Sequence, residues 1–176
     1  MKNKIRSAKK ILIIGDLGRG KTTLAENLSE ELDIPFYSTD DFLYEKKFSA
    51  YKEKSKSISE ISEIYKKDKW IVEGTTHFLL KNGLEPADII IYLKHDNIFS
   101  QWYSIIKRYF KREDKDILRT FWLLWHVLYK KLQTKSSRIK NGQMTTYERI
   151  EPYKNKVIIL KTFKDIDELI KSVKNI

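Results

Sequence analysis

The sequence contains no cysteine, which excludes disulfide bonds and thiolate metal sites. Proline is rare, at three residues, and glycine is scarce, at six, yet three of the glycines fall within Gly15–Gly20. Long hydrophobic runs are also missing. The most apolar run outside the first strand, Phe121–Tyr129, is far shorter than the ~18 residues that indicate a membrane span. No membrane partner is therefore expected.

The composition predicts one globular domain, because 41% of the 176 residues are hydrophobic and 34% are charged. Lys and Arg outnumber Asp and Glu by 35 to 24, giving a net charge of +11. Such an excess favours anionic partners, namely nucleotides, nucleic acid or acidic lipid; a merely lysine-rich composition is the alternative. The charged opening leads into an apolar run of only four residues. We therefore expect no signal peptide and a cytoplasmic protein.

Five short apolar runs alternate with longer amphipathic stretches. Their continuous apolar character is typical of strands buried on both faces of a parallel sheet. The alternation predicts an α/β fold with crossover helices. The candidate strands are residues 11–15, 35–39, 70–74, 88–93 and 156–162.

Two polar stretches give predictions about an insert and about the start of the last helix. Residues 44–60 are rich in Lys, Ser and Glu and read as a mobile, solvated insert, in which Ser57 and Glu60 would form a capping box for the helix that follows. Asp165 with Glu168 reads as the capping start of the last helix.

The segment from residue 94 to residue 140 concentrates the positive charge. It holds twelve Lys or Arg and four Asp or Glu, and so carries +8 of the +11. Its Trp, Tyr and Phe residues have helical spacing, which favours amphipathic helices with the aromatic side in the core. For the cations, a lid over a phosphoryl group is the preferred interpretation. A nucleic-acid surface is the other functional interpretation.

The stretch "GDLGRGKT" matches G-x-x-x-x-G-K-[ST] at every fixed position. Glycines let main-chain N–H groups converge on phosphate oxygens, and the following helix points its positive end at the same place. The lysine reaches the β- and γ-phosphates, and the threonine hydroxyl binds Mg²⁺. The sequence therefore predicts ATP or GTP binding by Gly15, Gly18, Arg19, Gly20, Lys21, Thr22 and Thr23.

Acidic residues end two further candidate strands. Asp40 and Asp41 follow the second strand, and Glu73 ends the third. All three are thus expected at the carboxyl edge of the sheet, where ligands bind in open α/β folds. There they would hold Mg²⁺ or accept a proton from an attacking hydroxyl. Helix capping by the aspartates and an ordinary turn carboxylate at Glu73 are the structural alternatives.

The P-loop, "IP…STDDF", "WIVEG" and "ADIIIYL" occur in an order and spacing that resemble the adenylate-kinase-like group of small P-loop kinases. The chain is most similar to bacterial DNA topology modulation proteins, which are predicted kinases. The resemblance implies a three-layer fold with a five-stranded parallel sheet in the order 2-3-1-4-5. It also implies one domain over 1–176, with an acceptor-binding insert at about 44–69 and a basic helical lid at about 105–145.

The same resemblance implies roles for single residues. Asp40 falls at the acceptor-side aspartate, while Thr22, Asp41 and Glu73 form the magnesium set. Lys107 and Arg108 match a Lys-Arg pair after the fourth strand, and Thr162–Lys164 would lie beside adenine. Two arginines that hold the acceptor phosphate in adenylate kinases are replaced here by Tyr44 and His77. The acceptor is therefore left open: a nucleoside, another small alcohol or something larger.

We accordingly predict an ATP-dependent phosphotransferase that uses Mg²⁺ and moves a phosphoryl group to a hydroxyl or phosphate of a small acceptor. The catalytic candidates are Lys21, Asp40, Arg108 and Arg112. Two alternatives stay open at this point. One is a nucleic-acid-associated NTPase or polynucleotide kinase, and the other is a nucleotide-binding regulator without turnover.

Overall fold

The computed structural model describes residues 2–16, 18–45, 50–94, 102, 106, 109–110, 117–132 and 144–174. Its centre is a five-stranded sheet in the order β2-β3-β1-β4-β5, and the four neighbouring pairs are all parallel. This confirms the predicted fold class and strand order. The strands are β1 (Lys10–Gly15), β2 (Phe36–Ser38), β3 (Trp70–Gly74), β4 (Ile89–Leu93) and β5 (Val157–Leu160).

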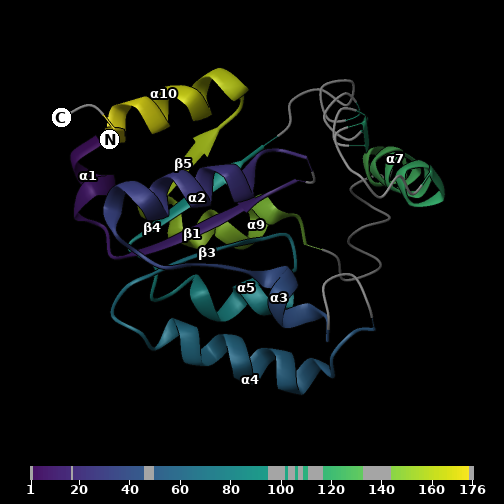
Figure 1. The fold of residues 1–176 in the computed structure, drawn as a ribbon, viewed down its shortest axis with the longest axis horizontal. Coiled ribbons are helices and arrows are strands. Elements are labelled where there is room, and N and C mark those ends of the chain that lie inside the picture. Colours follow the sequence, from purple (N-terminus) through teal and green to yellow (C-terminus); the bar gives the residue numbers. More distant parts are fainter. Residues whose placement is uncertain are drawn as a thin grey trace.

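Helices cover both faces of the sheet (Figure 1). One face carries α1 (Lys2–Ser7), α2 (Lys21–Leu32) and α10 (Phe163–Lys174). The other carries α3 (Thr39–Leu43), α4 (Lys54–Tyr65), α5 (His77–Leu80) and α9 (Thr146–Ile150), together with the short 3₁₀ turns η1 (Lys81–Gly83) and η2 (Glu151–Lys156). Because β1, β3 and β4 are buried along almost their whole length, their alternate residues supply two hydrophobic cores, one under each helical layer.

Part of the segment expected to be mobile is an ordered helix. α4 starts at Lys54 and buries Ile61, Ile64 and Tyr65 against the sheet. The prediction of a solvated insert over 44–60 is therefore wrong from Lys54 onward, because its sparse apolar residues are spaced to face one core. Ser57 does not cap this helix either, since it lies one turn inside and is fully buried.

The last helix is capped by a different pair from the one expected. Asp165 accepts hydrogen bonds from the N–H groups of Lys161 and Thr162, and its own N–H donates to the Thr162 hydroxyl. These contacts hold the pKa of Asp165 below its usual value, the Thr162 hydroxyl contributing most. The cap is thus Thr162 with Asp165, three residues apart as a capping box requires.

The longest helix among the described residues, α7 (Ile117–Leu132), stands apart from the sheet (Figure 1). Its aromatic side chains were expected in the core, and that expectation is wrong. Phe121, Trp122, Trp125 and Tyr129 are each more than half exposed. Helical spacing identified the apolar face correctly, but it contains no information on whether a core lies opposite that face.

Candidate active site

The glycine-rich loop joins β1 to α2 with the backbone geometry that a phosphate loop needs. Gly18 and Gly20 have φ of 75° and 79°, a left-handed conformation that glycine adopts without strain. Gly15 lies so close to β4 that a Cβ on it would stand 2.8 Å from the Cβ of Leu93. Successive N–H groups in such turns form anion-binding concavities, so these glycines give the loop the backbone shape of an anion site.

Lys21 begins α2 and turns its ammonium back over the loop. The side chain is 8% exposed, and Nζ donates to the carbonyl oxygen of Asp16 at 3.0 Å. The carboxylate of Asp16 lies near Tyr92, where burial and then the Asp16 charge raise the tyrosine pKa to about 12. The lysine charge is therefore held at the mouth of the loop, where it would meet the β- and γ-phosphates.

Glu73 is the buried centre of the site. Its carboxylate oxygen Oε1 accepts hydrogen bonds from Thr22 Oγ1 at 3.1 Å and from Ser38 Oγ at 2.9 Å, and the residue is only 4% exposed. Ser38 and Glu73 are paired in register on β2 and β3, so both side chains point to the face that carries α2. The P-loop threonine and the strand-end acid, 51 residues apart in sequence, thus share one oxygen cluster.

Ser38 extends this cluster to α3. Its side-chain oxygen also accepts the N–H of Asp40 at 3.3 Å and so caps the helix. Sequence reasoning missed Ser38, although its place directly before Thr-Asp-Asp is a capping signal. Gly74, at the end of β3, packs closely against the start of α3: a Cβ on Gly74 would stand 2.8 Å from the Cβ of buried Thr39. The start of α3 is therefore fixed against the end of β3.

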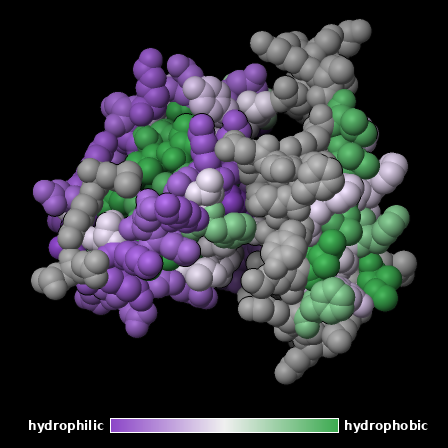
Figure 2. All heavy atoms as spheres, turned by 90° about the horizontal axis from the view of Figure 1, so that it is seen from above, coloured by the Kyte–Doolittle hydropathy of each residue, from purple (hydrophilic) through white to green (hydrophobic). Residues whose placement is uncertain are grey.

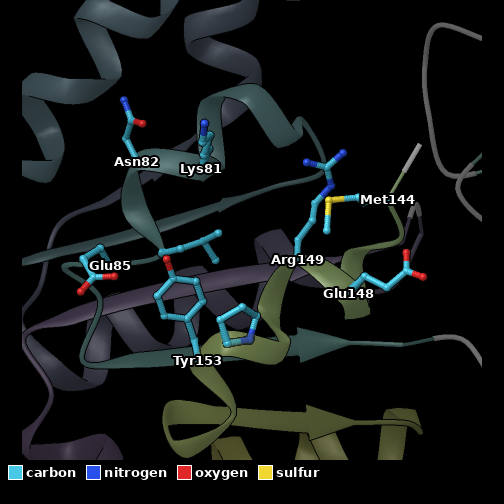
Figure 3. A pocket seen from close by; sticks show the side chains of 9 residues that line it. Lys81, Asn82, Glu85, Met144, Glu148, Arg149 and Tyr153 are labelled. Atoms are coloured by element: carbon cyan, nitrogen blue, oxygen red, sulfur yellow. The ribbon is translucent and has the colours of Figure 1, made fainter. Parts of the chain in front are cut away.

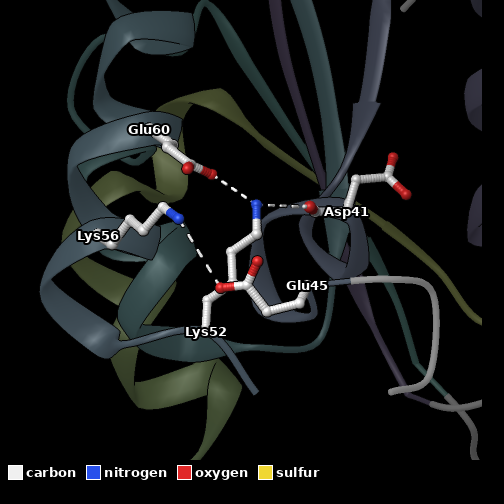
Figure 4. Close-up of polar contacts among 5 residues, drawn as sticks. All are labelled: Asp41, Glu45, Lys52, Lys56 and Glu60. Carbon is white, nitrogen blue, oxygen red and sulfur yellow. Dashed lines mark hydrogen bonds and ion pairs between the residues drawn. The ribbon is translucent and has the colours of Figure 1, made fainter. Parts of the chain in front are cut away.

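The two aspartates of α3 lie in different surroundings. Asp40 is half-buried and Asp41 is exposed. The carbonyl of Asp41 accepts from Lys52 Nζ at 3.4 Å, and the same ammonium pairs with Glu60 of α4 at 2.7 Å. In Figure 4 the Asp41 carboxylate extends away from that ion pair. Lys52 therefore ties α3 to α4 and leaves the aspartate carboxylate directed elsewhere.

The start of α10, directly after β5, borders the P-loop. The Arg19 guanidinium carbon lies 4.9 Å from the centre of the Phe163 ring, and Arg19 is 2% exposed. Phe163 is also the nearest neighbour of a Cβ built on Gly20, at 4.0 Å. A cation held over an aromatic face is attracted by its quadrupole; Arg19 thus fastens the loop to the start of α10.

The described part of the chain gives no side-chain contact in the site for the remaining predicted residues. Thr23 is exposed in the first turn of α2. Lys107, Arg108 and Arg112 lie outside the described residues. Among the described residues no group of three or more His, Asp or Glu side chains stands ready for a metal ion. Thr22, Ser38 and Glu73 instead offer two hydroxyls and one carboxylate, the oxygen donors that suit Mg²⁺ when substrate phosphates and water complete its shell.

A cavity of about 530 Å³ opens on the opposite helical layer, between η1 and α9–η2. Arg149, Met144 and Tyr153 project toward it in Figure 3. Burial, followed by the charge and hydrogen bond of neighbouring Glu85, raises the Tyr153 pKa. The cavity is lined by none of the residues predicted for nucleotide binding, so it is separate from the P-loop site.

Comparison with known proteins places the fold. No protein-family model matches the chain, and no curated protein sequence matches it either. A shikimate kinase structure from Bacteroides thetaiotaomicron has a TM-score of 0.54 at 12% identity, covering 96% of this chain and 97% of that one. A gluconokinase from Sinorhizobium meliloti 1021 has a TM-score of 0.56 at 13% identity, covering 93% and 88%.

A third match is shikimate kinase from Acinetobacter baumannii in complex with shikimate, with a TM-score of 0.52 at 15% identity over 97% and 94% of the two chains. At such identities the likeness concerns the fold alone. The chain therefore has the fold of small P-loop kinases. No helix among the described residues is both long and apolar enough to traverse a bilayer.

Proposed function

We propose that the protein is an ATP-dependent kinase that transfers a phosphoryl group to a small acceptor. The observation that carries this is the cluster of Thr22, Ser38 and Glu73 beside the left-handed glycines and Lys21. A glycine turn without a ligand would not need a buried carboxylate bonded to the P-loop threonine. The kinase neighbours support phosphoryl transfer. The closer resemblance to DNA topology modulation proteins remains a hypothesis.

In the proposed site, Mg·ATP supplies the phosphoryl group and a divalent charge that offsets its negative oxygens. The loop of Gly15 to Thr23 holds the phosphates through main-chain N–H groups, and Lys21 adds a positive charge. The Thr22 hydroxyl would bind the metal, and Asp41 and Glu73 would hold its water ligands. Asp40 orients the acceptor hydroxyl and takes its proton, and the lid cations Arg108 and Arg112 neutralise charge on the group in transfer.

The acceptor is proposed to be a small molecule, as with the shikimate and gluconate kinases of the same fold. The alternative of a nucleic-acid-directed enzyme receives no support from these neighbours. An ADP-release assay over nucleosides, nucleotides, sugars, hydroxy acids and oligonucleotides identifies the class. Turnover with oligonucleotides alone would favour the alternative, and ATP binding without turnover on any acceptor would indicate a regulator.

Lys21→Ala tests the nucleotide site directly. The substitution removes the ammonium from a loop whose backbone stays intact, so we expect a folded protein that no longer gains thermal stability from Mg·ATP. Lys171→Ala, at an exposed position of α10, is the matched control and should keep the full gain. An undiminished ATP-dependent shift in Lys21→Ala would contradict the proposal.

A further inference from the structure

α7 exposes an apolar face to solvent. Each of six large side chains on this one helix is between 55% and 70% exposed: Ile117, Phe121, Trp122, Trp125, Tyr129 and Leu132. Figure 2 shows apolar side chains gathered over this part of the molecule, on the right of the view. Soluble monomers rarely expose contiguous apolar patches of this kind, and those that occur are usually interaction sites.

The six side chains share one side of the helix. At 100° per residue they occupy an arc of about 140°, running from Ile117 to Trp122 in the order of their angles. Such an arc is broader than the narrow seam of a coiled coil and matches the apolar stripe with which an amphipathic helix covers an apolar surface. A helix that lies in a membrane interface presents an apolar face of this kind.

The positive charge of α7 favours an anionic surface over a second copy of this chain as its partner. α7 contains Arg119, Lys130 and Lys131 and no acidic residue, within a segment from 94 to 140 that carries +8. Packing α7 against a second copy of this chain would bring two such cationic helices together, with mutual repulsion. An anionic surface is attracted instead.

The apolar residues of α7 favour a bilayer over nucleic acid as its partner. Ile117 and Leu132 gain little from bases or phosphates, whereas a bilayer buries both in its acyl boundary. Trp and Tyr concentrate at membrane interfaces, where their polar edges meet the headgroups. We propose that α7 docks the protein on the surface of an anionic bilayer, apolar face inward, without spanning it. This inference does not depend on the proposed kinase activity. The expectation of no membrane partner rested on the absence of a spanning run and did not consider surface docking.

Co-sedimentation of the full chain with vesicles tests the proposal. We expect binding to phosphatidylcholine vesicles that contain roughly one third phosphatidylglycerol, weak binding to pure phosphatidylcholine, and loss of binding as salt rises toward roughly 1 M. Trp122 and Trp125 should shift the emission to shorter wavelengths on binding. The double variant Phe121→Ser/Trp125→Ser should reduce the partitioning of the protein onto vesicles about tenfold or more. It removes two aromatic side chains that the bilayer would bury.

Tyr147→Ser is the matched control, because Tyr147 is an exposed aromatic residue on α9; it should bind vesicles as the parent does. If the double variant does not fold, Lys130→Glu/Lys131→Glu provides the same test through charge. Equal binding to neutral vesicles, no binding at all, or equal loss in the control would overturn the proposal. So would a dimer, or tighter binding to DNA than to vesicles, that the same α7 substitutions abolish.

Discussion

Glu73 is the residue on which the site is built. Its buried carboxylate receives two hydroxyl groups, one from the P-loop and one from the neighbouring strand. Burying a carboxylate is costly unless hydrogen bonds compensate. A position of this kind is more readily explained by a bound cation than by stability alone, since an apolar residue would fill the same space at lower cost.

Glu73→Gln retains the shape of the side chain and removes its charge. We expect the Mg²⁺ requirement for ATP binding to rise roughly 10- to 100-fold, the range seen when supporting metal contacts are lost. The free energy of unfolding should change by only about 1 kcal/mol, as for one hydrogen bond. Titrating Mg²⁺ at fixed ATP measures the first quantity and denaturant unfolding the second. An unchanged Mg²⁺ midpoint would remove Glu73 from the metal site.

Asp40→Asn separates binding from chemistry. Loss of a positioned base typically lowers the rate 10²–10⁴-fold, while nucleotide contacts made by the P-loop are untouched. We therefore expect ADP release with a competent acceptor to fall by that order and the ATP-dependent thermal shift to persist. Asp33→Asn, at the end of α2, is a control that changes the same chemical group away from the site. A near-parental rate in Asp40→Asn would show that another group takes the proton.

At the scale of elements, the short helix α3 couples the acceptor side to the P-loop. Ser38 caps α3 and bonds Glu73 with the same hydroxyl, and Lys52 with Glu60 fastens α4 to it (Figure 4). Because α3 is only five residues long, its position depends on these contacts rather than on helix propensity. The place of Asp40 thus depends on Ser38.

Ser38→Ala should therefore affect catalysis more than binding. We expect a loss of about 1–2 kcal/mol in the free energy of unfolding from the missing cap, together with a fall in kcat that exceeds any change in ATP affinity. Thr145→Ala breaks the capping box of α9 and serves as the control, with a similar stability cost and unchanged kcat. Equal kinetics in the two variants would mean that α3 does not position the acceptor.

At the scale of the whole molecule, two buried tyrosines set the response to alkali. Burial raises the pKa of Tyr92 to about 12 and raises that of Tyr65 further, where the hydroxyl donates to the Leu79 carbonyl at 2.9 Å. Both lie in the core under α4 and α5. The folded protein therefore holds two protons that the unfolded chain releases near pH 10.

Since the unfolded state binds fewer protons above pH 10, the free energy of unfolding should fall as pH rises from about 10 to 12. Each tyrosine contributes a slope of about 1.4 kcal/mol per pH unit. Tyr92→Phe should remove roughly half of the combined slope of the two tyrosines. Denaturant unfolding across this pH range measures the effect. Parallel curves for Tyr92→Phe and the parent would contradict it.

The sequence alone determined the sheet and the P-loop. A strand that is covered on both faces needs a continuous apolar run, and a loop that wraps phosphate needs glycine at fixed positions. Both features can therefore be recognised from short stretches of sequence. Strand order 2-3-1-4-5 came from the resemblance and is confirmed. A helix was expected after Ser57, but α4 begins about one turn earlier, at Lys54, in a stretch of Lys and Ser that carries no apolar pattern of its own.

Only the tertiary structure decided which groups meet. The bonds from Thr22 and Ser38 to Glu73 join three segments that are distant in sequence, and strand register brings them together. In the same way, the pattern of α7 showed that one side is apolar but not whether that side is covered. Whether the apolar side of a helix is covered depends on where the chain places the neighbouring elements. The spacing of residues within one helix does not determine it.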